Sequence, residues 1–301
     1  SNTKALNSTD GSTSVVKATN TYSGTGGLHQ VYLGLGWSPF KGFAIGVNAA
    51  YLWGDYSRSV INSYTDAYAN TLSKYYTAEV HNYKLDFGMQ YTQKITKNDA
   101  ITLGVTYGLG HKLSSDPKCQ IISTNAQTAV ADTATYSIGN GLELPHSYGV
   151  GLMWNHANRW RVGADYTLQK WSSVAYPKFD TSTNSYELVS GQFADRHKMT
   201  VGGEFCPDER SRNFFKRVHY RMGASYATDY LKIKGQNGPK EYSVSAGFGI
   251  PIVNGYNNRS LLNISAQWVR QDSKTFVTEN SFRINIGLTF NERWFAKWKM
   301  E

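Results

Sequence analysis

Charged residues recur at alternate positions along segments whose other residues on the same side are small or polar. An arginine offers a planar fork of N–H donors that can bind a carboxylate through two hydrogen bonds, so these residues are candidates for receiving a ligand carboxylate. Charges that face an enclosed interior also need a partner or water, and they can equally stabilise the fold by pairing with one another. Both interpretations stay open. The candidates are Arg161, Asp165, Lys198, Glu204, Arg221 and Arg283.

The three arginines of this set are the preferred ligand contacts, because only arginine combines a permanent charge with a bidentate fork. Another pair of charges, Lys84 and Asp86, lies two positions apart in the sequence. Such residues share one face of a β-strand, and we therefore expect a direct ion pair between them.

The sequence shows no recognisable catalytic centre. Only His197, close to Asp195, resembles part of an acid–base pair, and neither a Gly-x-Ser-x-Gly nor a His-Glu-x-x-His motif occurs. The two cysteines, Cys119 and Cys206, fall in different connections that we place at opposite ends of the strands. We therefore expect no disulfide, no metal framework, no cofactor and no enzyme activity.

The elements that carry these residues alternate with a period of two, which is typical of β-strands. A transmembrane barrel strand needs about 9–11 residues, whereas strands of soluble β-sandwiches are usually about 5–6 residues long. The segments here reach the greater length and favour an antiparallel up-and-down β-barrel in a membrane over a sandwich or a lipocalin. Eleven long strands are predicted, near residues 28–38, 42–58, 76–95, 100–112, 146–156, 159–172, 196–206, 217–231, 241–251, 260–271 and 281–291.

The stretch Tyr148–Trp171 shows how the two faces are distinguished. Apolar residues from Tyr148 to Trp154 alternate with small or polar residues, and the pattern resumes after a short polar turn. Small residues and charges suit a crowded lumen, so the apolar face is predicted to point outward to lipid. Trp154 and Trp160 would then sit in an aromatic girdle at the membrane interface.

Composition agrees with this interpretation. The 301 residues include 21 tyrosines and 28 glycines, 40% are hydrophobic, and mean hydropathy is −0.46. No apolar run is long enough for a transmembrane helix, which needs about 20 residues. The formal charge of +9 comes without a compact basic run, so we expect no nucleic-acid partner.

Connections between the predicted strands alternate in length. Short turns such as residues 38–41, 96–99 and 156–158 alternate with longer polar segments at 59–75, 113–145 and 173–195. Outer-membrane barrels have this topology, with short turns on the periplasmic side. The pattern predicts a location in the outer membrane of a Gram-negative bacterium, in contact with its lipid.

The predicted strands divide the chain into three regions. Residues 1–27 are expected to be the remnant of an outer polar loop, 28–291 the barrel strands, and 292–301 a tail on the periplasmic side. Trp294 and Trp298 in the tail are expected to anchor it at the membrane interface. Because bacterial barrels usually have an even number of strands, an N-terminal part is expected to precede this chain.

Three stretches resemble the FadL-type outer-membrane transport proteins, in particular their Bacteroidota members: "YSGTGGLHQVYLGLGWSPFKGFAIGVNAAYLWGDYS" (22–57), "LPHSYGVGLMW" with "RWRVGADYTLQKWS" (144–154 and 159–172), and "INIGLTFNERWFAKWKME" (284–301). The resemblance implies a fourteen-stranded barrel of which eleven strands are visible, and an N-terminal hatch. The family's Asn-Pro-Ala hatch signature is not found.

The resemblance implies passive uptake of hydrophobic compounds, such as long-chain fatty acids, with a hydrophobic small molecule as ligand. Relatives of this family act instead with protein-secretion or barrel-assembly machinery. The alternative function is therefore a non-transporting barrel that serves as a partner subunit of such a complex in the outer membrane.

Overall fold

A single large antiparallel sheet dominates the chain. The computed structural model describes residues 2–7, 13–66, 68–180, 182–233, 235–254, 257–273 and 278–289. No helix within these ranges is both long and apolar enough to cross a membrane. The predicted tail at 292–301, with Trp294 and Trp298, lies outside the described residues.

All eleven predicted strands are present, and several are longer than expected. Consecutive strands pair in antiparallel fashion, which confirms the up-and-down arrangement. The bounds are β2 Thr13–Phe40, β3 Phe43–Tyr64, β4 Thr71–Lys94, β5 Asp99–Gly108, β10 Ser147–His156, β11 Trp160–Gln169, β14 Arg196–Phe205, β15 His219–Ala227, β18 Lys240–Asn254, β19 Asn257–Asp272 and β20 Glu279–Thr289.

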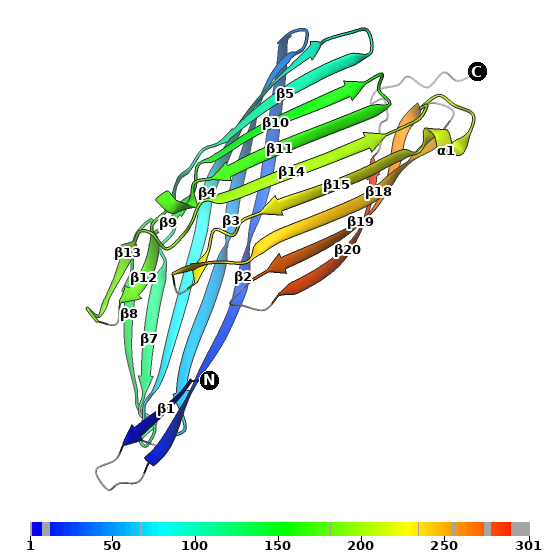
Figure 1. Cartoon of the computed structure of the whole chain (residues 1–301). Coiled ribbons are helices and arrows are strands. Elements are labelled where there is room, and N and C mark those ends of the chain that lie inside the picture. The colour runs from blue at the N-terminus through cyan, green and yellow to red at the C-terminus, as the bar shows by residue number, and fades with distance from the viewer. Residues whose placement is uncertain are drawn as a thin grey trace, which may run out of the picture.

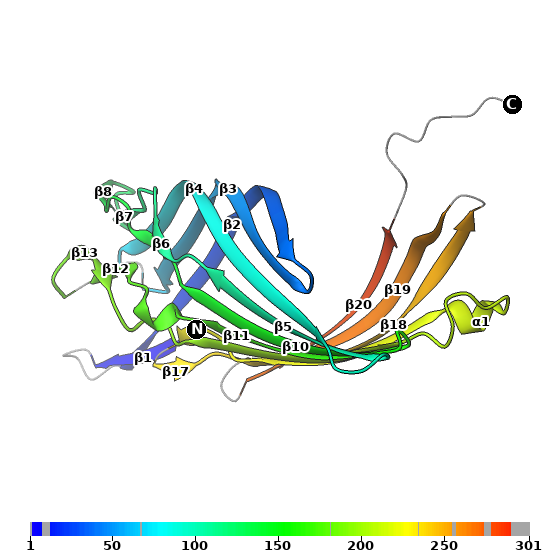
Figure 2. The same ribbon diagram turned by 90° about the horizontal axis from the view of Figure 1, so that it is seen from above.

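These strands follow one another across the sheet in the order of the chain (Figure 1). Seen from above, the sheet curves into a trough, with β2–β4 on one side and β18–β20 on the other (Figure 2). We call this curved sheet the wall. Among the described residues, no backbone pairing joins β20 to β1 (Asn2–Asn7) or β2.

The two faces of the wall differ as the sequence predicted. Directly opposed apolar residues continue from strand to strand, for example Leu103, Leu152 and Ala164. This apolar face is the exposed one: the exposed fraction is 53% for Leu152 and 73% for Ile286. Few apolar side chains are buried, since the large ones point away from the trough, as they do toward lipid in an outer-membrane barrel.

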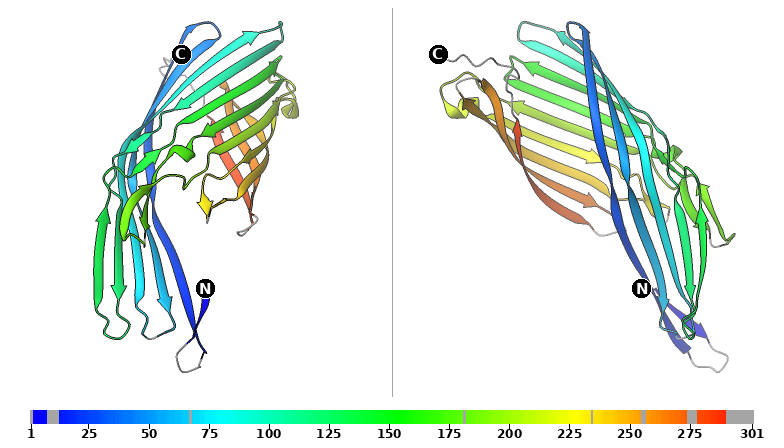
Figure 3. Two further views of the ribbon diagram at one scale, coloured as in Figure 1. Left: turned by 60° about the vertical axis from the view of Figure 1, so that its left-hand side comes forward. Right: turned by 180° about the vertical axis from the view of Figure 1, so that it is seen from behind.

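Long connections form further hairpins at one end of the wall (Figure 3). The segment predicted as a loop at 113–145 holds β7 and β8, and β7 extends the sheet by pairing with β4. The segment at 173–195 holds β12 and β13. The small strands are β6 His111–Leu113, β7 Lys118–Thr124, β8 Ala131–Ser137, β9 Leu142–Leu144, β12 Tyr176–Asp180, β13 Ser185–Val189, β16 Lys232–Ile233 and β17 Gln236–Asn237. The 3₁₀-helix η1 spans Trp171–Ser173.

The N-terminal region differs from the prediction of an outer polar loop at 1–27. Asn2–Asn7 forms β1, which pairs with the start of β2, and β2 pairs with β3 from Ala18 onward. Most of the predicted loop therefore belongs to β1 and β2. Polar Thr, Asn and Ser residues are compatible with β2 because its backbone pairs along its length, with β1 up to Ala18 and with β3 from there on.

Short turns form the opposite end of the wall. Ala157 and Asn158 connect β10 to β11 with φ of 53° and 56°, the left-handed conformation that tight two-residue hairpin turns require. The turn between β14 and β15 is longer and contains the short helix α1 (Phe214–Arg217), which Asn213 caps by accepting a hydrogen bond from the Phe215 N–H.

Candidate functional site

Glu204 in β14 is the centre of a charge network at the short-turn end of the wall. The register places it directly opposite Arg161 of β11 on one side and Arg221 of β15 on the other. Arg161 Nη1 lies 3.0 Å from Glu204 Oε1, and Arg221 Nε lies 2.6 Å from Oε2. One carboxylate thus links three neighbouring strands through charge-assisted hydrogen bonds.

The network extends to a histidine and a fourth strand. His219 Nδ1 lies 3.1 Å from Glu204 Oε1, and Arg221 Nη1 donates to Asn263 Oδ1 of β19 over 2.5 Å. The side chain of Glu204 is 17% exposed and that of His219 is 10% exposed. The carboxylate is therefore largely withdrawn from water, and its charge is balanced by the neighbouring cations.

The other three candidates also lie on the inner face of the wall, the face toward the trough. They belong to other rows, a row being a line of residues that stand opposite one another on adjacent strands. Asp165 stands opposite Gly151 and Thr200, and a Cβ added to Gly151 would lie 2.2 Å from Asp165 Oδ1. Lys198 is exposed and opposite Thr167, while Arg283 is exposed and opposite Gln267. No ion pair joins these three to another residue in the described part of the chain.

Lys84 and Asp86 pair as predicted. Both lie on the inner face of β4, and Lys84 Nζ donates a hydrogen bond to Asp86 Oδ2. The alternation rule alone was sufficient here, because residues two apart on a strand share one face.

Trp154 and Trp160 lie on the exposed apolar face, on either side of the turn between β10 and β11. Their exposed fractions are 43% and 47%. Trp154 Nε1 donates to Asp99 Oδ1 over 3.1 Å, and the Trp160 ring stacks on Phe205 with centroids 4.2 Å apart. The structure thus places both rings outward at the short-turn end. Their role in a membrane girdle stays a prediction.

His197 and Asp195 do not form the acid–base pair that their closeness in sequence had suggested. Asp195 binds Lys170 Nζ and accepts a hydrogen bond from the Ser172 N–H at 3.0 Å. His197 Nδ1 lies 2.7 Å from the Tyr166 hydroxyl. Each group is oriented by a different neighbour.

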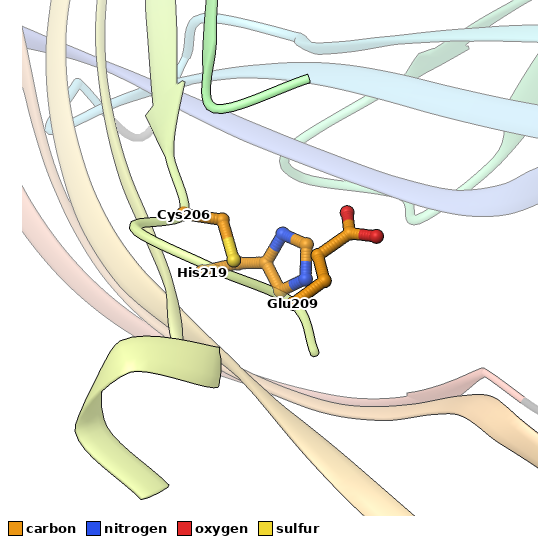
Figure 4. A group of neighbouring side chains, drawn as sticks. All are labelled: Cys206, Glu209 and His219. Atoms are coloured by element: carbon orange, nitrogen blue, oxygen red, sulfur yellow. The ribbon is translucent and has the colours of Figure 1, made fainter. Parts of the chain in front are cut away.

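The sequence reasoning overlooked a cluster formed by Cys206, Glu209 and His219 (Figure 4). One potential ligand atom from each residue lies within 4.8 Å of the other two. Both cysteines are free and buried; Cys119 lies in β7 and Cys206 directly follows β14. Counting cysteines alone could not reveal this cluster, whose signal was a Cys-x-x-Glu at the end of one strand and a histidine opening the next.

Comparisons with known proteins identify a family and a fold. The chain matches the BamG family over residues 4–301. A search of curated proteins yields no match.

Among solved structures, the chain is similar to the CymD monoaromatic hydrocarbon channel, with a TM-score of 0.59 and 12% identity over 86% of this chain and 73% of that one. It is also similar to the toluene transporter TbuX of Ralstonia pickettii, with a TM-score of 0.57 and 12% identity over 88% and 67%. A FadL homologue of Pseudomonas aeruginosa is similar with a TM-score of 0.52 and 14% identity, over 85% of this chain and 66% of that one.

The likeness to these structures confirms the FadL-like outer-membrane barrel fold that the sequence resemblance implied. At such low identity the likeness concerns the fold alone. The match over almost the whole length adds the family: this chain is a member of the BamG family.

Proposed function

We propose that this chain is a protein of the Gram-negative outer membrane through which hydrophobic compounds pass by diffusion. The observation that carries the proposal is the architecture shared with CymD, described as a monoaromatic hydrocarbon channel, and TbuX, described as a toluene transporter. The exposed apolar face supports it, because outward aliphatic and aromatic residues match the hydrocarbon of a membrane.

The inner face supplies a smooth surface for such a route. Gly163, Gly202 and Gly223 stand opposite one another on three adjacent strands. A row of Asp165, Thr200 and the hydrogen-bonded pair Ser225 and Ser243 lies beside it. Small side chains at these positions of β11, β14 and β15 keep this part of the concave side of the wall open.

For a ligand with a carboxylate, such as a long-chain fatty acid, we place the receiving charge on Arg283 or Lys198. Arg161 and Arg221 already direct hydrogen bonds to Glu204, so a ligand would have to compete with that carboxylate. Arg283 and Lys198 are exposed on the same inner face and keep their donors available.

The test is uptake of radiolabelled toluene and oleate by cells that carry the whole protein in place of the deleted gene. Ser225→Trp puts a large ring on the inner face of β15, and we expect it to lower uptake at least several-fold. Ala224→Trp, the next residue, puts the same ring on the outer face and should leave uptake unchanged. Equal uptake by the deletion strain and the complemented strain would contradict the proposal.

A second candidate function is that of a partner subunit in a secretion or barrel-assembly complex. Membership in the BamG family favours it, as does the charge network, whose ion pairs form within the chain and link strands of the wall. The hairpins β7–β8 and β12–β13 project from the end opposite the short turns and supply surface for a partner (Figure 3).

Purification of the tagged protein from solubilised outer membranes separates the two functions. A partner subunit should co-purify with barrel-assembly or secretion proteins in fixed stoichiometry. Replacing the β12–β13 hairpin by a short linker should then release the complex without changing uptake. A channel that works alone should show the reverse, with uptake lost in Ser225→Trp and no companion recovered.

A further inference from the structure

We propose that Cys206, Glu209 and His219 form a zinc-binding site where the turn between β14 and β15 meets the wall (Figure 4). A sulfur, a nitrogen and an oxygen ligand converge there within 4.8 Å of one another. Thiolate, imidazole and carboxylate are the ligands that Zn²⁺ takes in proteins, with metal–ligand distances of about 2.0–2.3 Å. Bonds of this length place the ligand atoms of a tetrahedral ion about 3–4 Å apart, so a small approach of the three side chains completes the site.

The wall itself positions two of the three ligands. Cys206 directly follows β14, and its N–H donates to the Arg159 carbonyl over 2.9 Å. His219 is the first residue of β15. Because β14 and β15 pair in a fixed register, the thiol and the imidazole lie close together before any ion binds. Such pre-positioning lowers the entropic cost of binding.

Glu204 orients the imidazole. Its Oε1 lies 3.1 Å from His219 Nδ1, so the proton of the neutral ring is held on Nδ1 and the lone pair on Nε2 is left for a metal. A carboxylate behind a ligating histidine is the usual support in zinc sites. Glu204 is in turn held by Arg161 and Arg221, which gives the charge network a second role.

Glu209 brings the turn to the metal. It is exposed and lies in the segment between β14 and α1, whereas Cys206 and His219 are buried. A zinc ion bound by all three would therefore join an exposed carboxylate of the turn to two buried residues positioned by strands. The fourth tetrahedral position remains for water, and the expected effect is a stiffer turn and a more stable wall at this end.

Cys119 is the matched control for Cys206. It is also buried and free, but it lies in β7, and no cluster of three metal-ligating residues in the described ranges includes it. A general reaction of buried thiols with metals would affect both cysteines. Metal binding at a specific site in the β14–β15 turn would depend on Cys206 and not on Cys119.

The test is titration of the full chain, refolded in detergent and freed of metal, with Co²⁺ as a spectroscopic substitute for zinc. We expect one Co²⁺ per chain, a thiolate-to-cobalt band in the near ultraviolet, and loss of that band when Zn²⁺ is added. Cys206→Ser should abolish the band and Cys119→Ser should leave it intact. Absence of the band in the parent chain, or equal loss in both serine variants, would overturn the proposal.

Two further variants test the exposed ligand and the carboxylate that supports the histidine. Glu209 is exposed, so Glu209→Gln should keep the parent circular dichroism and heat-modifiable migration while weakening Co²⁺ binding at least tenfold. Glu204→Gln should weaken binding by about 10–100-fold, as loss of a supporting carboxylate does at other zinc sites. An unchanged affinity of Glu209→Gln for Co²⁺ would mean that Glu209 is not a ligand and would overturn the proposed site. None of these measurements depends on transport or on a protein partner.

Discussion

The two ends of the wall are stabilised by different means. At the short-turn end, Glu204 joins Arg161 and Arg221 across three strands, although Arg161 and Glu204 are 43 residues apart in the chain. At the opposite end, aromatic rings from separate connections pack together: Trp171 stacks on Tyr230 with centroids 4.5 Å apart, and its edge contacts Phe193 at 5.7 Å.

The two kinds of contact differ because their residues lie in different kinds of segment. The charges at the short-turn end stand in strands, so register alone places them opposite one another. The rings at the other end belong to η1 and to connections, so the connections must fold before the rings can meet. We therefore expect changes at the first end to affect the whole wall, and changes at the second end to stay local.

The largest effect is expected from Phe193→Ala. Phe193 is 8% exposed and contacts Trp171, Tyr176 and Tyr230, so truncation would leave a cavity that costs about 3 kcal/mol. Hydrogen exchange should show faster opening of amides in β12 and β13, with amides in β14 and β15 unchanged. Phe215→Ala, at a 70% exposed position in α1, is the control. Equal loss of protection across the wall would contradict the local character of this end.

An intermediate effect is expected from Glu204→Gln. The substitution keeps the volume but removes the charge that Arg161, Arg221 and His219 share, and we expect the free energy of unfolding to fall by about 2 kcal/mol. Urea unfolding in detergent micelles measures it. Asp272→Asn removes the exposed pair with Arg270 and should cost less than about 1 kcal/mol. Similar losses in the two variants would mean that the network adds nothing beyond a surface pair.

The smallest effect is expected in the pH dependence of stability at the end of the wall opposite the short turns. Burial opposes ionisation of Asp195, but hydrogen bonds from Lys170 and Ser172 outweigh it and lower the pKa of this carboxyl from 3.8 to about 2. Since the folded state favours the ionised form, its stabilisation is complete above about pH 4 and is lost as the pH falls through 2. The pair is partly exposed, so less than about 1 kcal/mol is at stake.

Fluorescence of Trp171, next to Ser172, is the measurement for this pH effect. A single-tryptophan chain that keeps Trp171 should show a transition between pH 4 and pH 2, and Asp195→Asn should abolish it. A transition that survives in the asparagine variant would assign it to a different carboxyl.

Much of the wall was predictable because a strand repeats every two residues. The alternation from Tyr148 to Trp154 is a local property, and it correctly indicated which face points outward. The pairing of Lys84 with Asp86 followed from the same rule. The hairpins in residues 113–145 and 173–195 were missed because their strands are only 5–7 residues long, too short for alternation to distinguish them from a polar loop.

Site residues were predicted less completely. The sequence identified Arg161, Glu204 and Arg221 as charges of one face, but it could not show that they share one row while Asp165 and Arg283 stand in others. A shift of register by two residues would keep every charge on the same face and change all of its partners.

By itself, the sequence determined the strands, their two faces and the end at which turns are short, because these depend on neighbours within one segment. Only the tertiary structure decided which charges meet and that Cys206, Glu209 and His219 converge. Those contacts depend on the pairing of strands and on the path of a turn, and neither is recorded in local periodicity.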